Sequence, residues 1–471
     1  MNEDGATRFH AATARIIGLV SPGSVPPRRT AHGGRRRLVA IVTALVVLAA
    51  LAVTGVWAYG QRNPEAVVGN ATEEFVTTEA PATTAPADVA QDWPTYGYDN
   101  ARTRWNPSLA LRPPFREVWS LRTRNLLEFP PVVADGRLFT TQLLGRVFAV
   151  DAATGRWLWN KRTGHCSPSS PAYADGVVFV ALLAPIPCPK DGDRTSGGAL
   201  VAWDAASGRE LWRTEMAPTE SSPLVADGRV YVGAWDGNVH AVDTRTGAIR
   251  WSTQLGSQVT SSASWIDGAT TGGDPAIVIG TNDGSVFSLD AATGRILWRA
   301  RSNDRLGSGR EYFYASPTVA YGRVFIGNTD GWMYAFGART GRLIWARPAG
   351  TYVYTGAVAA DQVIYIGTYD GFIVAFDAAT GEERWRVAAP GAVHGAPTLM
   401  DGLLYFSTCS WCGHAGLRDA KEGPSGTYAL DIATRKIVWT FHDGKYSPLV
   451  SDGKRIYLSG TGIVHALEPG S

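Results

Sequence analysis

The chain has 471 residues, of which 45% are hydrophobic, so it is long enough to bury a large core. Its formal net charge is +2, and the arginine-rich residues 1–37 more than account for that excess. The remainder is near neutral and slightly acidic, which argues against a nucleic-acid-binding surface.

The first predicted element is a helix over residues 38–59, an uncharged apolar run. As a helix it would span about 33 Å, close to the hydrocarbon thickness of a bilayer. We therefore expect a single transmembrane helix. Residues 1–37 would form a disordered cytoplasmic tail, because basic residues such as Arg35, Arg36 and Arg37 stay on the cytoplasmic side. A cleaved signal peptide is the competing interpretation.

Residues 60–92 are rich in Thr, Pro and Ala, as in T-T-E-A-P-A-T-T-A-P-A-D at 77–88. Such a composition is too polar and too rich in proline to pack into a core. We expect this segment to be a stalk that carries the rest of the chain, residues 93–471, outside the cell membrane.

Residues 93–471 repeat a pattern of about 40 residues, a period typical of β-propeller blades. An apolar residue and an acid lead through Thr-Gly to a tryptophan, as in V-D-A-A-T-G-R-W-L-W at 150–159. A hairpin with an Asp-Gly type of turn precedes each phrase. We interpret the tryptophans as packing residues between blades. Their positions are Trp119, Trp159, Trp212, Trp251, Trp298, Trp345, Trp385 and Trp439.

The phase of the repeat predicts how the ring closes. Trp119 has no preceding strands of its own, whereas residues 447–468 have three predicted strands and no tryptophan. The simplest solution is that the N-terminal strand completes the C-terminal blade, which removes two exposed sheet edges. The sequence therefore predicts an all-β, eight-bladed propeller.

All four cysteines lie in the predicted external part, where disulfides form. Cys166 lies in a loop that enters an inner strand, and Cys188 lies in the loop between the second and third strands of the same blade. Both loops open on one face, so these two cysteines should meet. For Cys409 and Cys412 we expect a short structural disulfide, with a redox pair as the alternative. We expect no metal site.

One residue at the start of each inner strand should point into the mouth of the central channel. Residues 301–312 and both cysteine loops open on the same face, so we expect a ligand or partner there. The alternative is that this ring is only a solvated channel lining. Its members are Glu128, Pro168, Glu220, Thr260, Tyr314, Tyr354, His394 and Lys445. Two residues further on is a ring of mostly small side chains, namely Ser170, Ser222, Ser262, Ser316, Gly356, Ala396 and Ser447.

The phrase A-x-D-x-x-T-G-x-x-x-W resembles the tryptophan-docking repeat of the pyrroloquinoline quinone (PQQ) propeller superfamily. The segment W-P-T-Y-G-Y-D-N-A-R-T-R-W-N-P-S-L at 93–109 is similar to the opening of many quinoprotein dehydrogenases. Enzymes of this kind hold the quinone in the channel mouth with Ca²⁺ on carboxylates and an amide, use an Asp base, and commonly have an adjacent Cys-Cys ring. Non-enzymatic members include the propeller lipoprotein of the outer-membrane β-barrel assembly machine.

The chain departs from both models. It has no Cys-Cys, and although Glu128 and Glu220 could be oxygen ligands for Ca²⁺, no matching Asn and Asp are identified. No cysteine precedes Cys166, so a lipid-modified N-terminus is not possible. We therefore expect a membrane-anchored extracytoplasmic propeller that binds an unknown protein partner or small ligand, without a cofactor and without catalysis. The alternative is a PQQ- and Ca²⁺-dependent dehydrogenase of alcohols or sugars.

Overall fold

The computed structural model describes residues 32–62, 70–77, 92–188, 195–302, 312–410, 421–446 and 449–470. The chain divides into two compact units, Met1–Asn63 and Pro64–Ser471. The first contains the helix α1 (His32–Arg62). Within the described part of the chain, no helix combines the length and hydropathy that a membrane crossing requires, so the predicted transmembrane helix over 38–59 is not supported. The predicted cytoplasmic tail lies almost entirely outside the described residues.

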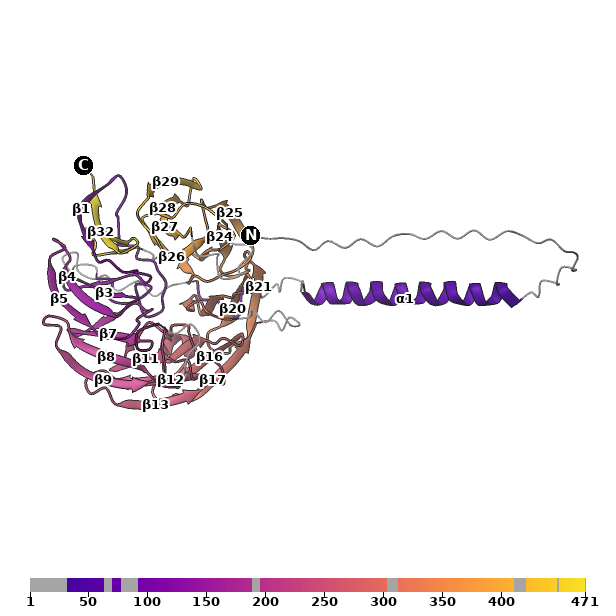
Figure 1. Ribbon diagram of the computed structural model, residues 1–471, viewed down its shortest axis with the longest axis horizontal. Helices are drawn as coiled ribbons and strands as arrows, with labels where there is room; N and C mark the ends of the chain where they lie inside the picture. Colours follow the sequence, from indigo (N-terminus) through magenta and orange to yellow (C-terminus); the bar gives the residue numbers. More distant parts are fainter. Residues whose placement is uncertain are drawn as a thin grey trace, which may run out of the picture. The chain divides into compact units, whose positions relative to one another are not determined.

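The second unit is a ring of eight four-stranded antiparallel sheets (Figure 1). The strands of each blade follow one another along the chain from the innermost outward. The first blade has β2 (Val132–Ala134), β3 (Arg137–Gln142), β4 (Arg146–Asp151) and β5 (Trp157–Arg162). The second has β6 (Ala172–Ala174), β7 (Val177–Leu182), β8 (Gly198–Asp204) and β9 (Glu210–Met216). The third has β10 (Leu224–Ala226), β11 (Arg229–Gly233), β12 (Asn238–Asp243) and β13 (Ile249–Gln254).

The fourth blade has β14 (Ser264–Ile266), β15 (Ala276–Gly280), β16 (Ser285–Asp290) and β17 (Ile296–Arg301), with the short helix α2 (Gly268–Thr271) after its first strand. The fifth has β18 (Thr318–Ala320), β19 (Arg323–Gly327), β20 (Trp332–Gly337) and β21 (Leu343–Pro348). The sixth has β22 (Val358–Ala360), β23 (Val363–Gly367), β24 (Phe372–Asp377) and β25 (Glu383–Ala388). The seventh has β26 (Val393–Met400), β27 (Leu403–Thr408), β28 (Gly426–Asp431) and β29 (Lys436–Phe441).

The eighth blade joins the two ends of the propeller, as predicted. It contains β30 (Val450–Ser451), β31 (Ile456–Ser459), β32 (Ile463–Pro469) and, as its outermost strand, β1 (Phe115–Arg122). β1 and β32 pair antiparallel, from Phe115 opposite Pro469 to Arg122 opposite Ile463. Figure 1 shows these purple and yellow strands side by side. The closed ring has no unpaired sheet edge at its seam.

The eight predicted tryptophans all lie on outermost strands, which agrees with a packing role. Trp298 shows how they dock. Its indole Nε1 donates to the carbonyl of Ala338 in the next blade at 2.9 Å, and a Cβ on Gly341 would approach its ring to 2.5 Å. Gly341 has a φ of +68°, so this glycine serves both the left-handed turn and the close approach of the ring. The Thr-Gly of the repeat therefore forms the turn and also the surface against which the tryptophan of the preceding blade packs.

The acid of the repeat caps the same turn. The Asp290 carboxylate accepts hydrogen bonds from the backbone N–H and the hydroxyl of Thr293 at 2.8 and 2.7 Å. These hydrogen bonds lower the pKa of Asp290 although its burial raises it. Equivalent carboxylates bond the Thr or Ser three residues later in five other blades, at Asp151, Asp204, Asp243, Asp377 and Asp431.

Residues 70–77, which fall within the predicted stalk segment 60–92, pack on the propeller. Phe75 lies against Tyr321 with ring centroids 5.7 Å apart, and the backbone N–H of Val76 donates to the Tyr321 carbonyl at 3.1 Å. Phe75 also packs against the hydrophobic core cluster of the fifth and sixth blades. The rest of this polar segment can pack because its partners are hydrogen-bonding groups.

Candidate functional site at the channel mouth

The ring of small residues lines the channel as a chain of hydrogen bonds between blades. The backbone N–H of Ser170 donates to Oγ of Ser222 at 3.0 Å, and that of Ser222 donates to Oγ of Ser262 at 2.9 Å. The N–H of Ser262 continues the chain to Oγ of Ser316 at 3.3 Å. These serines are buried, so their hydroxyls join neighbouring inner strands and are not offered to a ligand. Ser447 lies outside the described residues.

The segment 93–105 closes the channel beyond the serine ring. It passes the inner strands in turn: Trp93 pairs with Val133, and the carbonyls of Ala101 and Thr103 accept from the backbone N–H groups of two further blades at 2.9 and 3.1 Å. In the sequence, this segment shows only a resemblance to a known family. Its contacts with the inner strands were not predicted, because a segment that touches each blade once has no periodic pattern.

Two arginines of this segment are fully buried at the centre of the ring. Arg102 donates to the carbonyls of Ala263 at 2.7 Å and Ser222 at 3.2 Å. Burial and, to a lesser extent, the neighbouring Arg104 together lower the pKa of Arg102 to about 9. Both guanidinium groups lie over the ring of Tyr96, at 5.4 and 5.0 Å from its centroid. The channel therefore has a cationic floor.

The mouth on the other side of the serine ring holds a cluster of aromatic side chains. Tyr314 and Tyr354 stack with centroids 4.5 Å apart, and Tyr354 lies 5.1 Å from His394. Tyr369 and Tyr446 extend the cluster at 6.0 and 5.5 Å from the His394 ring. The predicted ring residues Tyr314, Tyr354 and His394 are thus brought together. Tyr369 and Tyr446 were missed, because they come from other positions of the repeat.

Two carboxyl groups belong to the same cluster. Glu220 accepts a hydrogen bond from the Tyr314 hydroxyl at 2.5 Å. Burial and, to a lesser extent, the charge of nearby Glu220 together raise the pKa of Glu128 to about 7. Burial also raises the pKa of Glu220, against the opposing effect of the Tyr314 hydrogen bond. Burial thus disfavours the charged form of both carboxyl groups.

The aromatic groups are uncharged. Burial holds the pKa values of Tyr314, Tyr354 and Tyr369 well above the ordinary phenol value. Burial lowers the pKa of His394 to about 4, although a hydrogen bond with the Tyr446 carbonyl raises it. A cluster of phenols, an imidazole and two carboxyl groups can donate and accept hydrogen bonds and present flat aromatic faces.

Of the remaining predicted ring residues, Lys445 contacts this cluster at the rim, with its Nζ 5.2 Å from the centre of the Tyr446 ring. Thr260 donates its hydroxyl to Asn282 Oδ1 at 2.8 Å. Pro168 is buried and offers no polar side-chain atom. The cluster therefore includes some of the predicted ring residues and not others.

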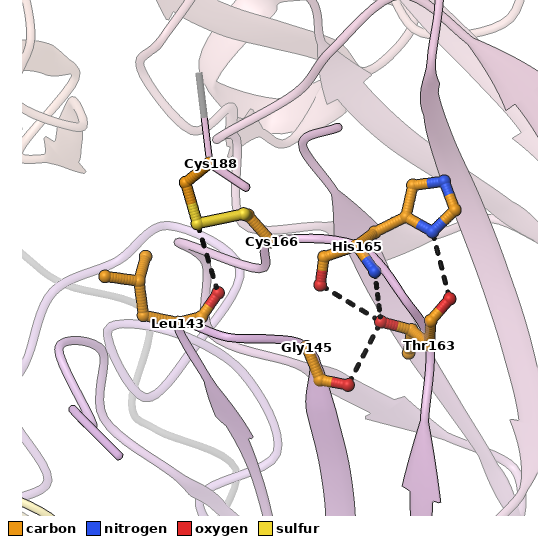
Figure 2. Close-up of a disulfide and its surroundings, with 6 residues drawn as sticks. All are labelled: Leu143, Gly145, Thr163, His165, Cys166 and Cys188. Atoms are coloured by element: carbon orange, nitrogen blue, oxygen red, sulfur yellow. Dashed lines mark hydrogen bonds between the residues drawn. A yellow bond between two sulfur atoms is a disulfide. The ribbon is translucent and has the colours of Figure 1, made fainter. Parts of the chain in front are cut away.

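The predicted disulfide between Cys166 and Cys188 is present and shapes the same face. Figure 2 shows it beside Leu143, whose carbonyl oxygen lies 3.9 Å from the Cys188 sulfur. Leu183 and Trp235 pack with it in a small apolar cluster. Cys409 is also disulfide-bonded, and its predicted partner Cys412 lies outside the described residues.

Comparison with known proteins agrees with this fold. A family model described as the outer membrane protein assembly factor BamB matches residues 108–185, 193–347 and 329–470. The chain belongs to this family. The BamB assignment confirms the predicted PQQ-like propeller superfamily.

Individual relatives of this BamB-family chain include another BamB protein and dehydrogenases. BamB from Moraxella catarrhalis aligns with a TM-score of 0.61 at 18% identity, over 75% of this chain and 99% of that one. A europium-containing methanol dehydrogenase aligns with a TM-score of 0.63 at 16% identity, over 80% and 91%. The 1-butanol dehydrogenase (cytochrome c) of Thauera butanivorans is 29% identical over 154 residues, which are 29% of this chain and 20% of that protein. The matched part is a small share of the dehydrogenase, so the shared property is the propeller.

Proposed function

We propose that this propeller is a non-catalytic binding module that receives a partner or ligand at the channel mouth. The observation that carries the proposal is the convergence of Tyr314, Tyr354, Tyr369 and His394 on one aromatic cluster, with Glu220 hydrogen-bonded to Tyr314. Tyrosine offers a large contact area and a hydrogen-bonding hydroxyl at low cost in side-chain entropy, which suits it to binding surfaces. The closed floor at Arg102 and Arg104 leaves the mouth as the accessible end of the channel.

The alternative is a quinone-dependent dehydrogenase, as some relatives are named. Ca²⁺ takes six to eight oxygen ligands in proteins. The mouth offers two carboxyl groups, Glu128 and Glu220, and the Tyr314 hydroxyl already donates a hydrogen bond to Glu220. Within the described residues, no group of three or more His, Cys, Asp or Glu side chains is arranged to hold a metal ion. PQQ is a polyanion, and Lys445 is the basic side chain that we find at this rim. These residues do not fit the quinone and its Ca²⁺.

A direct experiment separates the two functions. The purified protein is titrated with PQQ and Ca²⁺, while quinone absorbance and the reduction of an electron-accepting dye by alcohols and sugars are recorded. We expect no saturable absorbance change and no dye reduction. Tight quinone binding with turnover would overturn the proposal.

A second experiment tests the binding face. A photo-crosslinking amino acid is placed at Lys445 on the rim of the mouth, or at Leu297 on the outermost strand β17, where 38% of the side chain is exposed. We expect a discrete adduct in cells from position 445 and none from position 297. The adduct should weaken when Tyr354→Ala opens the aromatic cluster. Adducts at position 297 alone, or equally at both positions, would contradict a partner at the mouth.

We also propose that α1 associates with a membrane and that the propeller is extracytoplasmic. Large apolar side chains of α1 are exposed, with Val39 at 64%, Leu45 at 60% and Val53 at 68%, and a lipid phase would cover them. The arginines 35–37 then favour a cytoplasmic N-terminus. Reporter fusions before Met1 and after Ser471 test the orientation. An external N-terminus would refute it.

A further inference from the structure

Residues 70–77, here called the strap, lie in a groove between the fifth and sixth blades. Arg323 is fully buried beneath the strap and donates to the carbonyls of Asn70, Ala71 and Glu73 at 3.2, 3.3 and 2.7 Å. The same guanidinium donates to Ala378 O of the sixth blade at 2.9 Å. One buried side chain therefore joins two blades and three strap carbonyls.

The apolar part of the strap is Phe75. Its ring lies against Tyr321, and the Arg323 guanidinium lies 4.8 Å from its centre. This arrangement combines an aromatic contact with a cation–π interaction. At the other edge, Glu73 pairs with Arg342 at 2.8 Å, and because the Arg342 side chain is 70% exposed this pair adds little to affinity.

The strap also supplies a carboxylate that the fifth blade lacks in its repeat. The fifth blade has Gly337 where six other blades have the turn aspartate, so its turn lacks its own carboxylate. Glu74 supplies one: its Oε2 accepts from the backbone N–H of Arg339 at 3.0 Å, and its Oε1 accepts from the Thr340 hydroxyl. A Cβ on Gly337 would lie 2.6 Å from the Glu74 Cδ and from both carboxylate oxygens. Glu74 thus occupies the space of the missing aspartate.

We propose that this groove is a peptide-binding site for a Glu-Phe segment, and that the strap is its resident ligand. Three features define recognition of the peptide. At Gly337 the blade has no carboxylate of its own, so a peptide carboxylate can take that position. The buried guanidinium of Arg323 binds peptide carbonyls, and Tyr321 offers an aromatic face. In the six blades with a turn aspartate the carboxylate position is already filled. The substitution of glycine for that aspartate therefore directs the strap to this blade.

The equivalent groove elsewhere in the ring shows that space for a peptide is available between blades. Between the second and third blades, a cavity of about 770 Å³ is lined by Asp175, Val177, Arg229 and Arg245, among others. Asp175 and Val177 correspond in the repeat to Tyr321 and Arg323. This cavity has Asp175 in the place of Tyr321, although Phe179 lines it elsewhere, and the second blade retains its turn aspartate, Asp204, so the carboxylate position is filled.

A Glu-Phe segment of another protein would use the same three features of the groove and would therefore compete with the strap.

Proteolysis of the full-length protein tests the strap. An endoprotease that cleaves after glutamate should cut slowly at Glu73 in the wild type. Gly337→Asp fills the carboxylate position, so we expect it to expel the strap, accelerate this cleavage at least about tenfold and leave the melting temperature of the propeller nearly unchanged. Gly273→Asp adds the same carboxylate at a glycine where a Cβ would meet no heavy atom within 4 Å, and should not change the cleavage. Unchanged cleavage in Gly337→Asp would overturn the proposal.

A second variant keeps the test independent of how well Gly337→Asp folds. Glu74→Ala combined with Phe75→Ala weakens the strap and leaves the blade intact. A fluorescent peptide of residues 68–78 should bind this variant, should bind Gly337→Asp at least about tenfold more weakly, and should lose binding when its own glutamate is replaced by alanine. No peptide binding to the emptied groove, or equal binding to all three combinations, would refute a Glu-Phe recognition site.

Discussion

Tyr314 and Glu220 bridge the channel mouth: the phenol of the fifth blade donates a 2.5 Å hydrogen bond to the carboxyl group of the third blade, across the intervening fourth. The bridge connects blades that share no strand pairing. It also lowers the pKa of Glu220 against the stronger effect of burial. The mouth is therefore a preorganised surface in which rings and carboxyls hold one another in place.

Tyr314→Phe should remove this bridge and destabilise the protein by about 1–3 kcal/mol, because a buried acceptor loses its donor. The pKa of Glu220 should rise further at the same time. Urea unfolding measures the free-energy change. Tyr312→Phe is the matched control, since 40% of Tyr312 is exposed, and it should have little effect. Equal stability of the two variants would contradict the bridge.

Glu128 and His394 should make opposite contributions to the pH dependence of stability. Native Glu128, with its pKa raised from 4.5 to about 7, keeps a proton that the unfolded chain releases, so its contribution falls as pH rises through this range. Native His394, with its pKa lowered from 6.5 to about 4, stays neutral at pH values where the unfolded chain binds a proton. Its contribution to stability therefore rises with pH between those values.

Single substitutions should separate these two slopes. In Glu128→Gln, stability should rise between pH 4 and 6.5, and in His394→Gln it should fall between pH 4.5 and 7. Each change is at most about 3 kcal/mol at 1.36 kcal/mol per pKa unit. Urea midpoints measured across this pH range test both slopes, with the wild type between the two variants. Parallel profiles for the two variants would show that neither group titrates as described.

Trp298→Ala should lower the free energy of unfolding by about 3–5 kcal/mol, because it leaves a cavity over Gly341 and removes the hydrogen bond to Ala338. Trp298→Phe should cost less, since the ring remains. The control is Trp157→Ala on the outermost strand of the first blade, where 40% of the side chain is exposed. The control should lose less than half as much in urea unfolding; an equal loss would contradict the docking role.

Gly356→Ala should disturb the channel floor. A Cβ at this position would collide with Nη2 of the buried Arg104, so the guanidinium must move within a packed centre. We expect a loss of about 1–3 kcal/mol, as for other overpacked cores. Gly273→Ala meets no heavy atom within 4 Å and should be close to neutral. The difference between the two melting temperatures measures the constraint at the floor.

The propeller could be predicted from the sequence because its signals repeat. Eight tryptophans, the Thr-Gly turns and the unmatched strands at the two ends determine the blade number and the shared eighth blade. The meeting of Cys166 with Cys188 followed from the same topology. Of the mouth, the repeat register identified Glu128, Glu220, Tyr314, Tyr354 and His394, because each stands at the same place in its blade.

The parts that could not be predicted depend on contacts without a period. Arg102 and Arg104 reach several blades from one short segment, and their neighbours are distant in sequence. Glu74 belongs to a segment whose composition indicates a stalk, and only its partner reveals its role. One signal was available: F-G-A-R-T-G at 336–341 departs from the aspartate of the other repeats. A missing residue in a regular pattern indicates that another part of the chain supplies its function.

The pairing of β1 with β32 determines when the eighth blade can form during synthesis of the chain. Arg116 and Glu468 form an ion pair across that seam, 352 positions apart. The ribosome makes β1 before any other strand of the propeller and β32 last, so the eighth blade cannot form until synthesis of the propeller is nearly complete. Until then β1 has no sheet to join, and long-range closure of this kind is slow. During synthesis, β1 is therefore an unpaired strand that must be kept from pairing with other chains until β32 has been made.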